Sequence, residues 1–435
     1  MFGINLLNAS AVWASIGSVL LAVLILLIMV TVHEFGHYIA GKILKFKINE
    51  FSIGFGPAVF QHKSKKNGEK FSLRLIPLGG YCAFEDEDGL ASEEENDEKT
   101  IENIPVEEIF KDEKITPEKE EKLSTEADCE TKGEKVASGR FCDQKPWKRI
   151  IVLIAGATMN YLLALLFIIT EFFAYGQTML VTYEVEPSQT VSAEYSFHDK
   201  DIILQAAGRD VYMTTDLMSA VKNKQAGDTV EFYVSRLTGE TDENGKGIRE
   251  EKTITVELRE ATNFKNSADV DRLWEALGIA KQKNAANEVQ TDDDGNPVYM
   301  IYSTSYRFGF FKTLGDSFVY SFRVAGSIFK VLGELLTGAL GLDTMGGPIT
   351  TITVTSQIVS RGFRQFLEIS AYIGVNLAVF NLLPIPALDG SKVVFTLIEW
   401  VRGKPVNRKV EAMIHAIGFL LIFGFAILVD ILQFI

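Results

Sequence analysis

The chain has 435 residues, a net charge of −14 and 47% hydrophobic residues. From Ala11 to Thr31 it carries no charge, which is about the 20 residues that a helix needs to cross a bilayer, so a purely soluble protein is excluded. A pI near 5.0 without a basic stripe argues against a nucleic-acid partner. Three cysteines, Cys82, Cys129 and Cys142, are too few for a disulfide framework and are expected to be free thiols.

Residues 1–41 contain no Lys or Arg and are expected to form a first transmembrane helix that is retained, because their apolar run is longer than that of a signal peptide. Lys42, Lys45 and Lys47 follow at once, and the positive-inside rule places this end of the helix in the cytoplasm. Residues 42–84 alternate apolar and polar residues between glycines and prolines. This pattern is typical of β-hairpins, which we expect to lie against the membrane.

Residues 85–147 are expected to form an acidic cytoplasmic insertion. Within it, residues 85–145 hold 22 acidic and 9 basic residues, which is almost the entire net charge of the chain. Such a composition favours a solvated spacer, and a regulatory docking surface is the alternative. A second transmembrane helix, 148–175, follows the basic residues around Lys145 and therefore runs from the cytoplasm to the exterior.

Residues 176–262 are expected to form a small α+β domain outside the cytoplasm. Two short strand patterns precede an amphipathic stretch from Thr215 to Lys222, and two strand patterns, Thr229 to Arg236 and Lys252 to Leu258, follow it. This order resembles a PDZ domain of the bacterial protease type, which implies a peptide ligand captured by strand addition. The expected glycine-rich carboxylate loop is not evident at 187–190, so a spacing role without a ligand is the alternative.

Residues 263–366 are expected to combine a polar linker with an amphipathic helix between Phe311 and Leu336. That helix carries charged residues which a lipid-spanning helix would seldom tolerate, so we expect it to lie in the membrane interface. Packing of the helix on the soluble domain is the alternative.

We expect three further segments: a third transmembrane segment at 367–401, a basic cytoplasmic loop at 402–412 and a fourth transmembrane helix at 413–435. The predicted fold is thus a polytopic α-helical membrane protein with four transmembrane helices, a membrane-associated β-hairpin region and an inserted extracytoplasmic PDZ-like α+β domain. Both termini are expected outside the cytoplasm.

The sequence H-E-F-G-H lies at the cytoplasmic end of the first transmembrane helix. His33 and His37 are four residues apart, so both imidazoles lie on one helical face and can bind one Zn2+. Glu34 lies beside the open position of such a metal, where it can act as base for a water molecule. Ionisable residues in an apolar helix are costly, which favours a functional site over polar residues at the headgroup boundary.

A catalytic zinc needs a third protein ligand, and the third transmembrane segment contains a candidate. It reads N-L-L-P-I-P-A-L-D-G, in which the two prolines break the helix just before Asp389. The derived topology brings this carboxylate to the depth of His33 and His37. A buried carboxylate that caps the following helix is the alternative role.

These two motifs, with a PDZ-like insert between them, resemble those of the site-2 protease family of intramembrane zinc metalloproteases, and most closely the bacterial regulator-of-sigma-E-protease group. The resemblance implies Zn2+ as cofactor, His33, His37 and Asp389 as its ligands, and Glu34 as the catalytic base. It also implies single-span membrane proteins as substrates, such as anti-sigma-factor-like proteins or signal-peptide remnants after a first cleavage. The location implied is the bacterial cell membrane, with the active site towards the cytoplasm.

Further positions match the family pattern. Asn376 and Asn381 match residues that hold the unwound substrate, with helix-packing amides as the alternative role. Gly156 and Asn160 are retained in the second transmembrane helix, although the proline that usually follows the glycine is absent. At the third ligand the chain reads Asp-Gly-Ser where the family often reads Asp-Gly-Gly.

Two functions from other classes are weighed against proteolysis. A membrane-anchored PDZ scaffold would bind no stoichiometric zinc. An ion transporter would use the same ligands but would need no glutamate base, and it is expected to contain inverted repeats that this chain lacks. His62 and His198 lie in polar loops, and His415 is expected to have an interfacial or packing role.

Overall fold

The computed structural model describes residues 6–65, 67–85, 139–186, 192 and 195–433, except for 244, 246, 267, 286, 293–294 and 342–345. Most of the acidic insertion expected at 85–147, together with Cys129 and the loop at 187–190, lies outside the described residues. The chain forms two compact units, one from Met1–Phe167 and Gly346–Ile435, the other from Ile168–Met345.

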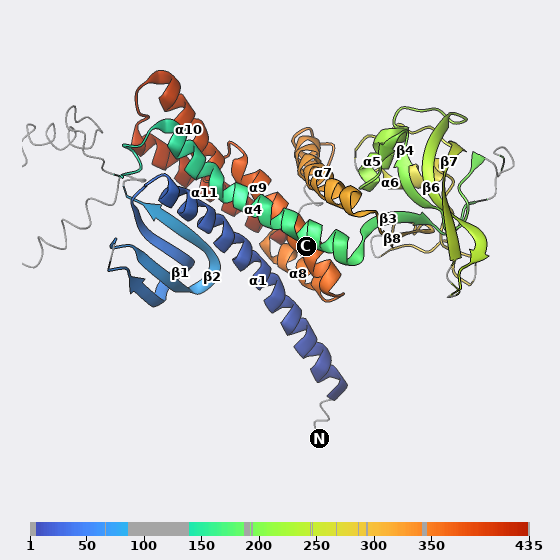
Figure 1. Ribbon diagram of the computed structural model, residues 1–435, viewed down its shortest axis with the longest axis horizontal. Helices are drawn as coiled ribbons and strands as arrows, with labels where there is room; N and C mark the ends of the chain where they lie inside the picture. Colours follow the sequence, from blue (N-terminus) through green and yellow to red (C-terminus); the bar gives the residue numbers. More distant parts are fainter. Residues whose placement is uncertain are drawn as a thin grey trace, which may run out of the picture. The chain divides into compact units, whose positions relative to one another are not determined.

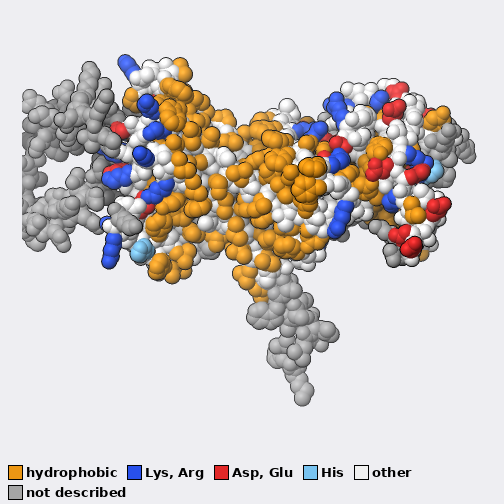
Figure 2. Space-filling view, in the orientation of Figure 1, with side chains coloured by type: hydrophobic (Ala, Val, Ile, Leu, Met, Phe, Trp, Pro, Cys, Tyr) orange, Lys and Arg blue, Asp and Glu red, His pale blue; other side chains and the backbone are white. Residues whose placement is uncertain are grey.

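The first unit is built mainly from helices (Figure 1). They are α1 (Leu6–Ile43), α4 (Pro146–Tyr175), whose last turns belong to the second unit, α8 (Pro348–Val359), α9 (Phe363–Leu382), α10 (Asp389–Arg402) and α11 (Arg408–Gln433). α1, α4 and α11 are rich in apolar residues, and Figure 2 shows hydrophobic side chains gathered over the helices of this unit. Such a surface is suited to lipid rather than to water.

Within the described residues, three helices are long and apolar enough to cross a membrane: Ile16–Ile43 in α1, Pro146–Tyr175, and Lys409–Leu432 in α11. The apolar segment expected at 367–401 is divided between α9 and α10. The break at 383–388 contains Pro384 and Pro386, as their missing N–H groups and fixed φ predict.

A two-stranded hairpin packs along α1 (Figure 1). It consists of β1 (Ile48–Lys63) and β2 (Lys70–Phe84), which pair antiparallel. Ile53 pairs both with Leu73 and with Gly80, so both strands bend and the first half of β1 lies between the two halves of β2. Alternating residues in this region do form strands, in agreement with the sequence pattern.

The second unit contains an antiparallel sheet with the strand order β7-β6-β4-β3-β8, and β5 pairs with β4. Its elements are β3 (Gln177–Thr182), β4 (Ile202–Ala206), β5 (Arg209–Asp210), α5 (Thr214–Val221), β6 (Thr229–Thr241), β7 (Gly247–Glu257), α6 (Val270–Ala276) and β8 (Ile301–Tyr306). We call this part the strand module.

The strand module extends beyond the boundary expected at residue 262. Leu273 and Trp274 of α6 and the following Ile279 are buried in the same core as Phe232 of β6. β8 pairs with β3 along its whole length. The range 263–366, which we expected to begin as a polar linker, therefore supplies a helix and an edge strand, because a few well-spaced apolar residues within it complete the core.

Helix α7 (Phe310–Leu336) packs its polar side on the strand module. Asp316 is buried and accepts a hydrogen bond of 3.0 Å from the Tyr212 hydroxyl, and Arg323 pairs with Asp216 at 3.3 Å. Burial and the neighbouring carboxylates Asp316 and Asp210 raise the pKa of Tyr212, which remains a hydrogen-bond donor at neutral pH. The opposite side exposes a row of large apolar residues: Phe311, Phe318, Phe322, Phe329 and Leu336.

Candidate active site

The two histidines of the H-E-x-x-H motif lie on one face of α1, in the last turns of its apolar stretch. His33 and His37 are buried, with 8% and 7% of their surfaces exposed. Their Nε2 atoms are 3.1 Å apart. The spacing of four residues on a helix produces this approach directly.

Asp389 is the first residue of α10, directly after the proline break. Its Oδ2 atom lies 3.0 Å from His33 Nε2 and 3.2 Å from His37 Nε2. Two motifs that are more than 350 residues apart in sequence therefore meet at one point. Within the described chain, these three side chains form the cluster whose ligand atoms are close enough to hold one metal ion.

The donor set fits Zn2+. Ligand atoms bound tetrahedrally at about 2.0–2.1 Å are separated by about 3.3 Å, and the three donor pairs of this cluster are separated by 3.0–3.2 Å. Two imidazoles and one carboxylate leave a fourth position for water or substrate, as in catalytic zinc sites. The combination of nitrogen and oxygen donors also suits zinc better than Mg2+ or Ca2+, which prefer oxygen alone.

Helix α4 orients both imidazoles. His37 Nδ1 lies 2.8 Å from the backbone oxygen of Val152, so this nitrogen carries the proton and Nε2 has a free lone pair. Asn160 is fully buried, and its Nδ2 atom lies 3.4 Å from His33 Nδ1. Its Oδ1 atom finds no hydrogen-bond partner among the described residues. A half-turn of this amide lets Oδ1 accept the His33 Nδ1 proton and leaves the second Nε2 free for the metal.

Gly156 of α4 provides the space for the two imidazoles. A methyl group on Gly156 would lie 2.8 Å from His33 Nε2 and closer still to His37 Nε2. The glycine that the sequence motif retains is therefore required by the two histidines and not only by the approach of the helices. The missing proline of the motif does not affect this space.

The break before Asp389 is held from several sides. The N–H group of Ala387, which has a left-handed φ of 80°, donates to His415 Nδ1 at 3.1 Å. A methyl group on Gly390 would overlap the backbone oxygen of Leu383, so glycine is needed after the ligand. The ion pair between Arg149 and Glu399, at 2.6 Å, joins α10 to α4. These contacts hold the backbone on both sides of Asp389 and attach α10 to α4.

Glu34 is half-buried and lies next to the hairpin. A methyl group on Gly80 of β2 would come within 3.4 Å of Glu34 Cγ. The carboxylate predicted to be the base is therefore placed between the histidine cluster, which begins at the preceding residue, and a strand of the hairpin.

The two predicted substrate-holding amides lie on α9 and do not join the cluster. Asn376 is half-buried and donates from Nδ2 to the Tyr372 oxygen at 2.9 Å, a bond within its own helix. Asn381 is half-buried in the last turn before the proline break. Neither has a hydrogen bond to His33, His37 or Asp389 among the described residues.

Sequence reasoning missed two residues of the site. Asn160 was noted only as a retained family position, and His415 was expected to pack or to lie at the interface. Asn160 lies in α4 and His415 in α11, and no local pattern indicated their roles, because their partners are 127 and 28 residues away.

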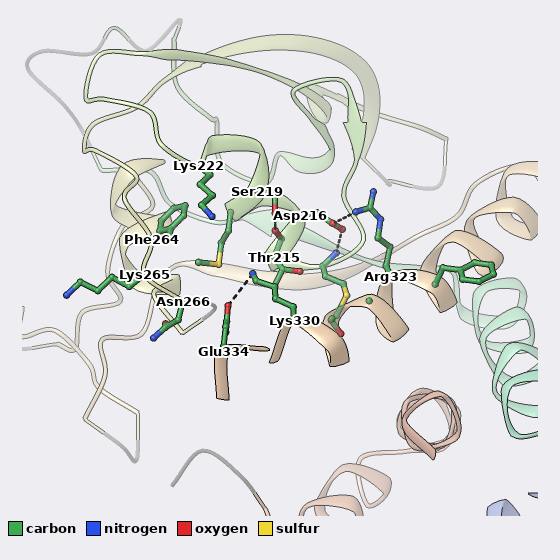
Figure 3. A pocket seen from close by; sticks show the side chains of 15 residues that line it. Thr215, Asp216, Ser219, Lys222, Phe264, Lys265, Asn266, Arg323, Lys330 and Glu334 are labelled. Carbon is green, nitrogen blue, oxygen red and sulfur yellow. Dashed lines mark hydrogen bonds and ion pairs between the residues drawn. The ribbon is translucent and has the colours of Figure 1, made fainter. Parts of the chain in front are cut away.

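A separate cleft of about 290 Å³ lies between α5 of the strand module and α7 (Figure 3). Lys222 and Lys265 line it together with two ion pairs, Asp216–Arg323 and Lys330–Glu334. The lining comes from two helices and the loop at 264–266, so the cleft offers no strand edge to a peptide. It contains none of the predicted site residues.

Known proteins of one peptidase family are similar to this chain over almost its whole length. A model of peptidase family M50 matches residues 21–425. The chain is 28% identical to the regulator of sigma-W protease RasP of Bacillus subtilis, over 93% of this chain and 94% of that protein. It is 27% identical to the zinc metalloprotease RasP of Oceanobacillus iheyensis, over 91% and 93%, and 26% identical to a putative zinc metalloprotease of Fusobacterium nucleatum, over 95% and 97%. Because the family match takes in almost the whole sequence, the chain belongs to peptidase family M50.

Proposed function

We propose that this zinc metalloendopeptidase hydrolyses peptide bonds within or next to the transmembrane segments of other membrane proteins. His33, His37 and Asp389 would hold the zinc ion, and Glu34 would be the catalytic base. The observation that carries the proposal is the meeting of three donor atoms, 3.0–3.2 Å apart, at the end of the apolar helix α1. Ionisable side chains in an apolar, membrane-spanning helix cost folding free energy and are therefore found mainly where a functional site requires them.

Each side chain has a defined task in this reaction. Zn2+ supplies Lewis-acid chemistry when it is bound, because it polarises a carbonyl group and acidifies a water molecule. The Glu34 carboxylate accepts a proton from the attacking water and donates it to the nitrogen of the leaving amine. Val152 and Asn160 keep the protons of both imidazoles on Nδ1, away from the metal side.

A transmembrane helix must unwind before it can be cut, because its peptide groups are shielded by their own hydrogen bonds. The hairpin supports a route for this step. Residues 80–84 of β2 pair with the first half of β1 on one side only, so this segment is an edge, and Gly80 lies beside Glu34. An unwound substrate segment that added to this edge as a strand would pass directly along the catalytic base.

We further propose the topology that the charges indicate. The lysines after α1 and the basic residues before α4 lie in the cytoplasm, which places the active site on that side. Both termini and the PDZ-like strand module then lie outside, and α9 with α10 completes a fourth crossing. The exposed apolar row on α7 would lie in the membrane interface, with its polar side against the module.

The substrates proposed are single-span membrane proteins. One relative is named for the regulation of a sigma factor. By analogy, anti-sigma-factor-like proteins or signal-peptide remnants, already shortened by a first cleavage, are the class expected here. The strand module would act as a size filter that excludes substrates with large intact domains, and it could take a peptide ligand.

The filter can be tested by removing the module. The N–H group of Tyr183 donates to the Met300 oxygen at 2.8 Å, so residues 184–299 can be replaced by a short linker without separating β3 from β8. Such a chain should cut intact substrates that the full chain rejects. Unchanged selectivity would contradict the filter.

The catalytic proposal is tested with a tagged single-span reporter that is coexpressed with the full chain. We expect the wild type to cut the reporter and to bind one zinc ion. Glu34→Gln should keep the zinc and lose about 10²- to 10⁴-fold in rate, because general acid–base catalysis contributes this much. Asp389→Asn should lose zinc. Glu368→Gln, which changes an exposed carboxylate on α9, is the matched control and should behave as wild type.

Two outcomes would contradict the proposal. Cleavage at the normal rate by Glu34→Gln would remove the assigned base. A wild-type protein that holds no zinc and cuts nothing would instead favour a membrane-anchored PDZ scaffold.

A further inference from the structure

We propose that the outer edge of β8, residues Ile301–Tyr306, is a docking site for the extended segment that directly follows a substrate's transmembrane helix. The segment would add to the sheet as an antiparallel strand. The proposal rests on the proposed function, because it takes a membrane-embedded substrate as the occupant.

The backbone of β8 is free on one side. β8 is the last strand of its sheet and pairs with β3 in a regular register. Tyr183 N–H donates to the oxygen of Met300, so even-numbered residues of β8 face β3 and odd-numbered residues face outward. The N–H and C=O groups of Ile301, Ser303 and Ser305 therefore form a row that no other described residue pairs with.

The two edges of the sheet differ in chemistry. β7, at the opposite edge, carries a run of charged residues from Arg249 to Lys252, and charges of this kind protect an edge against unwanted pairing. β8 has the sequence I-Y-S-T-S-Y, without a charge or a proline. Tyr302, Ser303 and Ser305 are exposed. An edge strand of this length without such protection can pair with another extended segment, and we infer that β8 functions by this pairing.

The position of β8 in the chain identifies the occupant. The Ser305 hydroxyl donates to the oxygen of Tyr175, and Arg307 Nη2 donates to the oxygen of Ala174 at 2.8 Å. These oxygens belong to the last turn of α4, a helix long and apolar enough to cross a membrane. The end of β8 is thus tied to the end of a transmembrane helix, at the level where a substrate segment leaves the bilayer.

Strand direction adds a constraint. β8 runs towards the end of α4, so an antiparallel partner runs away from it. A substrate that leaves the bilayer in the N-to-C direction therefore fits this edge, and six paired residues would extend about 20 Å from the boundary. Tyr302 and Tyr183 form an exposed aromatic pair with ring centroids 4.9 Å apart, which favours apolar side chains on the same face of the added strand.

The test compares two reporters that share one transmembrane segment. One carries a six-residue stub of Val and Thr, and the other carries a stub of the same length with proline at alternate positions, which cannot pair. Ser303→Pro in the full chain removes an outward N–H and keeps the bonds to β3. Ser303→Ala, which retains the N–H, is the matched control, and Ser303→Lys puts a charge on the edge, retains the N–H and leaves the Ser305 bond to Tyr175 in place.

We expect the wild type and Ser303→Ala to cut the pairing stub about tenfold faster than the proline stub, a difference of about 1.4 kcal/mol, the size of one or two net hydrogen bonds. Ser303→Pro and Ser303→Lys should cut both reporters at the lower rate. Equal rates on the two stubs for the wild type, or full preference in Ser303→Lys, would overturn the proposal.

A readout without catalysis separates this proposal from the proposed function. In the Glu34→Gln chain, a photo-crosslinking residue in place of Tyr302 should capture the pairing stub and not the proline stub. A wild type that cuts neither reporter while this crosslink forms would reject the proposed function alone. Crosslinks only to a second copy of the chain would show that the edge joins copies, and would reject the docking site.

Discussion

The substitution Gly156→Ala tests the metal site through a single methyl group. This carbon would lie 2.8 Å from His33 Nε2, whereas ordinary contacts begin at 3.4 Å, and it would approach His37 Nε2 more closely still. The imidazoles must then move by about 0.6 Å or more, and metal sites tolerate about 0.2 Å. Because this displacement moves two of the three proposed ligands, we expect zinc affinity to fall at least about 100-fold, or about 2.8 kcal/mol.

The assay is the zinc content of the purified protein after dialysis against chelators of increasing strength. Alanine favours a helix over glycine by about 1 kcal/mol, so unfolding of α4 is not the expected cause of a loss. Gly424→Ala in α11 is the matched control, because a methyl group there meets nothing within 4 Å. Wild-type zinc affinity in Gly156→Ala would refute the location of the site.

Other predictions follow from the surrounding contacts. Asn160→Ala should weaken zinc binding about 10- to 100-fold, because His33 loses the side chain that orients it, whereas Asn160→Asp should retain zinc binding. Chelator competition measures both affinities. Equal zinc affinities of Asn160→Ala and the wild type would refute the role of this amide. Gly80→Val should reduce cleavage about 100-fold at unchanged zinc content, because its Cβ would lie 2.7 Å from the Ser52 oxygen and force β2 off the Glu34 side chain. Burial opposes ionisation of Glu50, but hydrogen bonds from Ser72, Arg74 and Tyr81 outweigh it and hold its pKa below the ordinary value. The free energy that ionised Glu50 contributes to folding is therefore fully present above the pKa of the unfolded state, and it is lost as the pH falls through the lower pKa of the folded state. Amide hydrogen exchange in the hairpin, corrected for intrinsic rates, should speed up over this pH range in the wild type. It should not speed up in Glu50→Gln.

The motifs were predictable because their signals are local. H-E-x-x-H needs only the period of a helix to bring His33 and His37 together, and the prolines before Asp389 break a helix wherever they occur. The hairpin and α4 follow from alternation and from apolar length in the same way. The meeting of Asp389 with the histidines required the additional argument from topology and charge.

The remaining features depend on distant partners. The boundary of the strand module was set too early because Leu273, Trp274 and Ile279 are sparse in a polar segment and become core only when they meet β6. Helix α7 was expected at the membrane interface, yet its buried Asp316 also packs on the strand module. The spacing of polar and apolar residues shows that a helix has two different sides, but it does not identify what each side contacts. The orientation of His33 by Asn160 is a contact across 127 residues, which no local pattern indicates.

The proposed zinc ligands are His33, His37 and Asp389. X-ray absorption at the zinc edge of the purified chain is the most direct test of this ligand set. We expect two imidazole nitrogens and carboxylate or water oxygens, all at about 2.0–2.2 Å, with loss of one oxygen ligand or of the zinc itself in Asp389→Asn. Sulfur at about 2.3 Å would assign the metal to cysteines such as Cys82 or Cys142 and would refute His33, His37 and Asp389 as its ligands.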